Sequence, residues 1–162
     1  MSTNGFVANR LVARYRHIAN APPEEVFPLL CPVREAEWIK GWSAKVIFSD
    51  SGAAENNCVF TTNLPGRGET TYVVTRYDNE HFAIEFVIFN PGMLVEKLDI
   101  SVTKSAEGKS ELCWTRSYTG LSPEGNSWAE GYVNGPFQQR MSGLAESMNS
   151  YLDRQAQGMR SA

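Results

Sequence analysis

HFAIEFVIFNPGMLVEKLDISVTK, residues 81–104, contains two runs of β-favouring residues separated by Asn90-Pro91-Gly92. The runs at 81–89 and 94–104 are rich in β-branched and aromatic side chains, which fit the pleated surface of a strand. A turn as short as Asn-Pro-Gly places consecutive strands side by side in opposite directions. The stretch therefore predicts an antiparallel hairpin. Both faces of 81–89 are largely apolar, so the pattern leaves open which of them points inward.

The same period-two pattern continues on both sides of this hairpin. The turn signals DSGAAEN, LPGRG, DNE and AEG separate further runs of alternating residues. These connections are again too short for anything but antiparallel neighbours. Together with an early alternating run, they predict a seven-stranded antiparallel sheet, whose other strands are 11–19, 43–49, 57–63, 69–78 and 110–120.

Two short helices are predicted between the first and second strands. In ANAPPEEVFPLL (19–30), two prolines and then Glu24 and Glu25 are typical of a first helical turn. A helix over about 23–30 fits this pattern. PVREAEWIKG (32–41) allows a second short helix, closed by Gly41.

A long amphipathic helix is predicted at the end of the chain. From Ser127, apolar residues recur in steps of three and four, at 133, 137, 141, 144, 148 and 151/152. Ser127 to Glu130 matches a capping box, Gly135-Pro136 predicts a kink or a fresh start, and Gly158 ends the period. This helix is the available cover for one face of the sheet, and a sheet curled around one helix leaves room for a ligand. The predicted class is α+β.

Composition excludes several functions. The chain has 162 residues, a net charge of −3 and no run of like charges, which argues against nucleic acid as a partner. Its three cysteines are far apart, so we expect buried free thiols rather than disulfides or zinc. His17 and His81 lack ligand spacing, so no metal and no cofactor is predicted. The absence of a leader-like start and of an apolar run of about 18 residues favours a cytoplasmic protein with no stable membrane insertion.

The last predicted strand carries the clearest polar signal. Leu112, Trp114, Arg116 and Tyr118 alternate and therefore share one face. We expect this face to be concave, because Trp and Tyr are costly to leave exposed together. A buried Arg116 then needs an anionic partner. The candidates are Glu96, Glu35 or a carboxylate on a ligand.

LLCPVREAEWIKGW (29–42) concentrates aromatic surface and charge, and two interpretations remain open. In one, the segment forms the lip of a pocket, with Glu35 as an acid or base and Trp38 and Trp42 facing a ligand. In the other, it is a corner where both tryptophans seal the core and Glu35 pairs with a strand arginine. Arg34 can stack on Trp38 or pair with Glu37.

The order of elements resembles the START and birch-pollen-allergen-like superfamily, also called SRPBCC, in its polyketide cyclase/dehydrase and lipid-transport type. The similar segments are APPEEVFPLL (21–30), CPVREAEWIKGW (31–42), GRGETTYVVTRYDNEHFAIEF (66–86) and YTGLSPEGN (118–126). The resemblance covers about residues 10–155. It implies a helix-grip fold, in which the sheet curls around the C-terminal helix, and a single START-like ligand-binding domain over 1–162. The superfamily is defined by a deep hydrophobic cavity.

The first functional hypothesis is a non-enzymatic protein, monomeric or homodimeric, that binds a small apolar or amphipathic molecule, such as a lipid or an aromatic polyketide-like compound. The alternatives are a cyclase, dehydratase or hydrolase that uses Glu35, Glu85 or Glu96 in the same cavity, and a protein-interaction module like the chaperone activators of the superfamily. Trp128 and Tyr132 are placed at the mouth of the cavity. The predicted ligand contacts are Trp38, Trp42, Phe60, Tyr72, Glu96, Trp114, Arg116, Tyr118, Phe137 and Met141.

Overall fold

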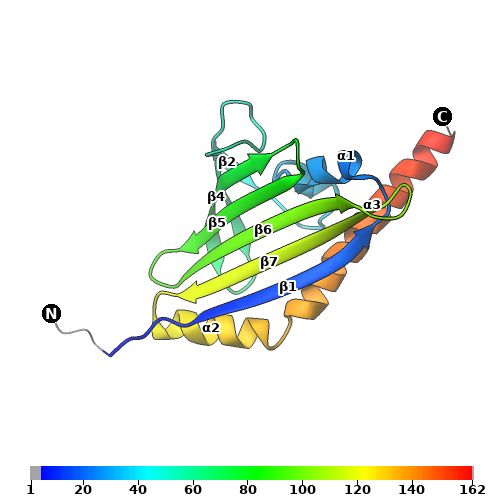
Figure 1. Cartoon of the computed structure of the whole chain (residues 1–162). Coiled ribbons are helices and arrows are strands. Elements are labelled where there is room, and N and C mark those ends of the chain that lie inside the picture. The colour runs from blue at the N-terminus through cyan, green and yellow to red at the C-terminus, as the bar shows by residue number, and fades with distance from the viewer. Residues whose placement is uncertain (1–4, 162) are drawn as a thin grey trace.

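A computed structural model describes residues 5–161 and shows an α+β fold in which one sheet curls over helices (Figure 1). Within these residues the strands are β1 (Arg10–Ala19), β2 (Lys45–Phe48), β3 (Val59–Leu64), β4 (Gly68–Asp78), β5 (Ala83–Asn90), β6 (Leu94–Lys104) and β7 (Ser110–Gly120). The helices are α1 (Pro23–Val26), α2 (Pro123–Val133) and α3 (Phe137–Ser161), with short 3-10 turns η1 (Phe27–Leu30) and η2 (Arg34–Glu37).

The predicted antiparallel sheet is confirmed. Its order is β1-β7-β6-β5-β4-β3-β2, so the first strand closes onto the last and the other strands follow as hairpin neighbours. The opening hairpin is formed by β5 and β6, with Asn90 paired to Leu94 and the Met93 amide donating to the Asn90 carbonyl over 3.1 Å. Gly92 has φ of 70°, a left-handed conformation that this turn requires and that glycine adopts at no steric cost.

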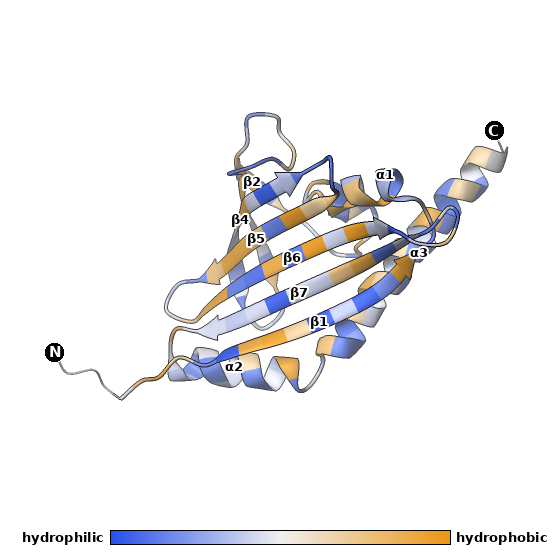
Figure 2. Ribbon diagram, in the orientation of Figure 1, coloured by the Kyte–Doolittle hydropathy of each residue, from blue (hydrophilic) through white to orange (hydrophobic). Residues whose placement is uncertain are grey.

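Alternation along the strands decides which side chains form the core. In Figure 2 hydrophobic and hydrophilic residues alternate along β5, β6 and β7, and burial alternates with them. Ile84, Phe86 and Ile88 form the inner face of β5, which resolves the ambiguity left by the sequence. The last strand is oriented as predicted, because Leu112, Trp114 and Tyr118 are all buried. The inner face of the sheet is therefore apolar and needs a cover.

That cover is α3, which runs beneath the sheet (Figure 1). Phe137, Met141 and Met148 are almost fully buried, and Val133 and Leu144 are half-buried beside them. The predicted apolar face of the helix is thus confirmed. The predicted break at Gly135-Pro136 separates two helices, because α2 ends at Val133 and α3 begins at Phe137.

Both predicted ends of the long helical segment are wrong. Helix α2 begins at Pro123, where the Ser122 hydroxyl accepts a hydrogen bond from the Gly125 amide over 3.1 Å. Ser127 therefore lies inside this helix. Ser122 already provides the cap, and the proline that follows it suits the first helical position, where no amide hydrogen is needed. Helix α3 continues past Gly158 to Ser161, since an exposed glycine costs a helix only about 1 kcal/mol.

The segment between β1 and β2 forms a corner of the core. The predicted second helix is only the 3-10 turn η2, and Arg34 pairs with Glu37 over 2.9 Å instead of stacking on Trp38. The Trp38 indole donates to the Leu29 carbonyl and the Trp42 indole to the Pro32 carbonyl, each over 2.8 Å. Through these hydrogen bonds both tryptophans anchor η2 and the segment after it to the backbone at residues 29 and 32.

The cysteines are free thiols, as predicted. Cys31 and Cys58 are buried, whereas Cys113 on β7 is only half-buried, so the expectation of burial is wrong for that residue. Among residues 5–161, no helix combines the length and the apolar character that crossing a bilayer requires.

We predict unequal roles for the two indole hydrogen bonds. Trp38→Phe leaves the buried Leu29 carbonyl without its donor and should lower the free energy of unfolding by about 1–3 kcal/mol. Trp42→Phe is the matched control, because Trp42 is half-buried and water can replace its hydrogen bond. This variant should lose less than half as much free energy of unfolding as Trp38→Phe. Urea unfolding of both variants measures the difference, and equal losses would contradict this account.

Candidate functional site

A cavity of about 450 Å³ lies between the sheet and the helices. Its walls come from the inner face of the sheet, from the segment after η2, and from α2 and α3. The apolar part of its lining is Ile39, Trp42, Phe60, Leu64, Pro65, Phe86, Leu98, Trp114, Trp128, Met141 and Leu144, together with the rings of Tyr72, Tyr118 and Tyr132.

Most of the residues predicted from the sequence meet at this cavity. Trp42, Phe60, Tyr72, Glu96, Trp114, Arg116, Tyr118 and Met141 all line it, as does Glu35. Trp38 and Phe137 instead lie in the packed core beside it, where they are 5% and 1% exposed. The interpretation in which the tryptophans seal a corner of the core thus holds for Trp38. Trp42 both anchors its segment through a hydrogen bond and lines the cavity. A ligand-contact role for the lining residues stays a prediction.

Aromatic rings from neighbouring strands form one wall. Phe60 and Tyr72 face each other across β3 and β4 and stack with centroids 4.6 Å apart. Phe86 on β5 meets both of them edge-on, at 6.3 and 6.0 Å. Such pairs restrain one another, so this wall presents a rigid apolar surface to the cavity.

A buried ionic cluster adjoins the aromatic wall. Glu96 on β6 is 1% exposed and accepts from two arginines: Arg67 Nη1 donates to its Oε1 over 2.6 Å, and Arg116 Nη1 donates to its Oε2 over 2.5 Å. The prediction that Arg116 is paired with a buried anion is confirmed, and Glu96 is the partner. Two guanidiniums on one carboxylate leave this cluster with a net charge of +1.

Arg67 is a site residue that the sequence pattern does not single out, because Gly66-Arg67-Gly68 indicates only a turn. Its side chain is 3% exposed, because it folds back from the β3–β4 turn over the sheet. The Arg67 Nε donates to Asn90 Oδ1 over 2.8 Å, and its guanidinium lies 5.3 Å from the centre of the Trp128 ring. The β3–β4 turn lies at the same end of the sheet as Asn90, which would indicate that Arg67 and Asn90 can meet. That placement can be derived only when the register of both hairpins is known.

Asn90 is a second polar residue that the sequence did not single out. It is 5% exposed, and its amide nitrogen donates to the Arg67 and Glu69 carbonyls and to Thr70 Oγ1 over 2.9–3.2 Å. One asparagine thus fixes both the backbone and the side chain of Arg67. The arginine is positioned before any ligand arrives.

Glu35 is a carboxyl of a different kind. It is half-buried, lines the cavity from η2, and forms no ion pair within 4.0 Å among residues 5–161. Burial raises its pKa to about 8, and the positive charge of Arg116 opposes that shift without cancelling it. Burial also raises the pKa of the Tyr72 and Tyr118 phenols above their ordinary value. At neutral pH the cavity therefore contains a carboxylic acid and two neutral phenols.

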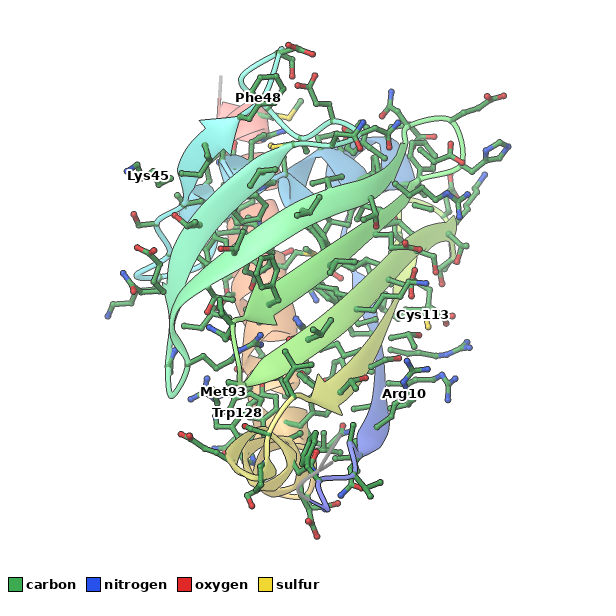
Figure 3. All side chains as sticks on the ribbon, turned by 90° about the vertical axis from the view of Figure 1, so that its left-hand side faces the viewer. Arg10, Lys45, Phe48, Met93, Cys113 and Trp128 are labelled. Atoms are coloured by element: carbon green, nitrogen blue, oxygen red, sulfur yellow. The ribbon has the colours of Figure 1, made fainter. Side chains whose placement is uncertain are left out.

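Exposed lining residues mark the mouth of the cavity. Lys40, Asn63 and Arg140 line it and are exposed. Trp128 and Tyr132 on α2 stack beside them, with centroids 4.9 Å apart and planes 14° apart. Figure 3 shows Trp128 at the end of the sheet where Met93 lies, as expected from the tight packing of α2 on that turn.

The remaining candidates lie elsewhere. Glu85 points to the outer face of the sheet, where it pairs with Lys97 over 3.3 Å, so its proposed place in the cavity is wrong. His17 accepts a hydrogen bond from the Trp114 indole over 2.9 Å, and burial lowers its pKa. His81 is exposed beside Asp78. Within residues 5–161, no group of three or more His, Cys, Asp or Glu side chains could bind a metal.

Comparisons with known proteins agree with this architecture. Norcoclaurine synthase from Thalictrum flavum, solved in complex with dopamine and hydroxybenzaldehyde, has a TM-score of 0.67 and 13% identity, over 91% of this chain and 88% of that one. For Ara h 8.0201 the TM-score is 0.58 and the identity 12%, over 88% and 97% of the chains. The di-domain ARO/CYC protein BexL from the BE-7585A biosynthetic pathway has a TM-score of 0.62 and 13% identity, over 88% of this chain and 46% of that one.

At these identities the solved structures share the fold alone. No curated protein matches the chain in sequence. A family model described as "Polyketide cyclase / dehydrase and lipid transport" matches residues 10–149, which is most of the chain. Together with the helix-grip architecture, this match shows that the chain belongs to the polyketide cyclase/dehydrase and lipid transport family of the SRPBCC superfamily.

Proposed function

We propose that the protein binds a small apolar or amphipathic organic molecule in the cavity between the sheet and α3. The observation that carries the proposal is a cavity of about 450 Å³ with aromatic walls and a few convergent polar groups. Its volume lies in the range of about 300–1,000 Å³ that is usual for small-molecule sites. A filled interior would have supported the alternative of a protein-interaction module, and this interior is not filled.

The chemistry of the lining limits the ligand. Phe60, Tyr72 and Phe86 offer flat apolar contacts, while Met141 adds a side chain that adapts to irregular shapes. One structural neighbour, norcoclaurine synthase, is described with two small aromatic molecules. Because it shares only the fold with this chain, the proposal rests on the lining residues found here.

A second candidate function is acid–base catalysis in the same cavity. The observation that favours it is Glu35, whose pKa of about 8 makes it a proton donor at neutral pH. The Tyr72 phenol lines the same cavity and can polarise a carbonyl group. Glu96 is less suited to proton transfer, because both of its oxygens accept from arginines.

A cavity-filling substitution tests the binding proposal. Leu144→Trp adds an indole to the wall formed by α3 and should weaken binding of the neutral probe N-phenyl-1-naphthylamine by about tenfold or more. Leu121→Trp is the matched control, because Leu121 is 43% exposed and does not line the cavity. Fluorescence titration measures both affinities. Unchanged binding by the Leu144 variant would show that the probe binds elsewhere, and no binding by the unaltered protein would refute the proposal.

The raised pKa of Glu35 predicts a pH-dependent stability. Between its ordinary value of 4.5 and about 8, the folded protein binds a proton that the unfolded chain releases, so this contribution to stability falls as pH rises. Glu35→Gln removes the titration, and the variant should gain stability relative to the unaltered protein from about pH 5 to about pH 8, with no further gain above that.

Urea unfolding across this range measures the difference. Glu37→Gln is the control from the same turn, because a hydrogen bond from Arg34 lowers the Glu37 pKa and its titration lies below the range. A Glu35→Gln curve parallel to that of the unaltered protein would show that Glu35 titrates normally.

A further inference from the structure

The arginines beside Glu96 have donors that the protein leaves unused. Arg67 Nη2 and Arg116 Nε are buried and have no hydrogen-bond acceptor among residues 5–161. Buried polar atoms are nearly always paired, because an unpaired donor loses its hydration without compensation. Both residues line the cavity, and their side chains are only 3% and 14% exposed. Two unused guanidinium donors at one site point to an acceptor that the ligand brings.

The charge of the cluster leads to the same conclusion. Arg67 and Arg116 share the single carboxylate of Glu96, so one positive charge is left without a buried counter-ion in the described part of the chain. A buried net charge is costly unless it is paired. Among residues 5–161, the other carboxyl on the cavity wall is Glu35, which is protonated in most molecules at neutral pH because its pKa is about 8. One negative charge on the ligand would restore neutrality.

We propose that Arg67 and Arg116 form a recognition site for one carboxylate group of the ligand, so that the preferred ligands are small apolar monocarboxylates. This inference rests on the proposed function, since it names the ligand class of the same cavity. A carboxylate is planar and accepts several hydrogen bonds, which matches the fixed donors of a guanidinium. Asn90 fixes Arg67 by accepting from its Nε, and the Trp128 and Trp114 rings lie 5.3 and 5.8 Å from the two guanidiniums.

The aromatic wall then accommodates the rest of the ligand. Phe60, Tyr72 and Phe86 line the same cavity as the ionic cluster and present their ring surfaces to it. The arrangement therefore orients the ligand, with its charge at Glu96 and its apolar body along the sheet.

A pair of isosteres tests the proposal on the unaltered protein. Calorimetric titration compares naphthalene-2-carboxylate with naphthalene-2-carboxamide, which has the same shape and no charge. We expect the carboxylate to bind more tightly by at least about tenfold near neutral pH. The preference should survive about 0.5 M salt, because a buried contact is screened far less than an exposed one.

Two variants with the same change of charge locate the effect. Arg67→Gln should abolish the preference for the carboxylate while leaving carboxamide binding within about twofold. Arg140→Gln is the matched control, because Arg140 is exposed at the mouth beside Tyr132, and this variant should retain the preference. If Arg67→Gln does not fold, the isostere comparison and its salt dependence still decide the question.

Four results would overturn the proposal. Equal affinity for the two compounds, or a preference for the carboxamide, would exclude a carboxylate site while leaving the proposed binding function intact. If the preference for the carboxylate disappears at about 0.5 M salt, it arises from charges at the exposed rim of the cavity. Equal losses of this preference in the Arg67 and Arg140 variants would also assign it to the rim. Binding of neither compound would refute the carboxylate site, and the proposed function fails with it only if N-phenyl-1-naphthylamine also does not bind.

Discussion

One buried carboxylate, Glu96, constrains both the fold and the cavity. It joins the turn between β3 and β4, which supplies Arg67, to the last strand, which supplies Arg116. Removing Glu96 would leave two buried guanidiniums without their counter-ion, and an unpaired buried charge typically costs about 3–5 kcal/mol. The three side chains therefore depend on one another. They also keep this part of the interior charged, where most of the inner sheet face is apolar.

The cavity exists because helix α2 is anchored away from the sheet centre. A side chain at Gly125 would approach the Met93 carbonyl to 1.8 Å, so α2 packs its backbone directly on the β5–β6 turn. This close contact places Trp128 and Tyr132 at the mouth, while α3 covers the sheet farther along. The space between is walled by rings that restrain one another. Its polar groups are likewise fixed by the fold, which reduces what a ligand must order on binding.

The strands and their inner faces could be predicted because burial alternates with period two. This is why the inward direction of Arg116 could be predicted from spacing, whereas Glu96 was one of three candidate partners. Period-two alternation gives no information about contacts that depend on tertiary structure. Arg67 lies in a turn, where no periodicity indicates direction, and its burial follows from the meeting of two hairpins. Trp38 and Phe137 show the converse: their burial is evident from residue type, but whether a buried ring faces core or cavity depends on helix placement. The start of α2 was predicted wrongly because Ser122 and Ser127 both suit a helix cap. The distinguishing feature is the proline that follows Ser122 and not Ser127.

Glu96 and Glu35, the two carboxyls on the cavity wall among residues 5–161, have different surroundings. Glu96 accepts a hydrogen bond from a guanidinium on each of its oxygens, so both oxygens are already paired within the protein. Glu35 is half-buried and has no ion-pair partner among the described residues, and its burial favours the neutral form. If Glu35 were ionised, it would itself neutralise the arginines and compete with an anionic ligand. Keeping it protonated leaves the positive charge available. The same raised pKa that suits Glu35 to proton transfer therefore also suits the cavity to a carboxylate, so anion binding and acid catalysis are compatible in this site.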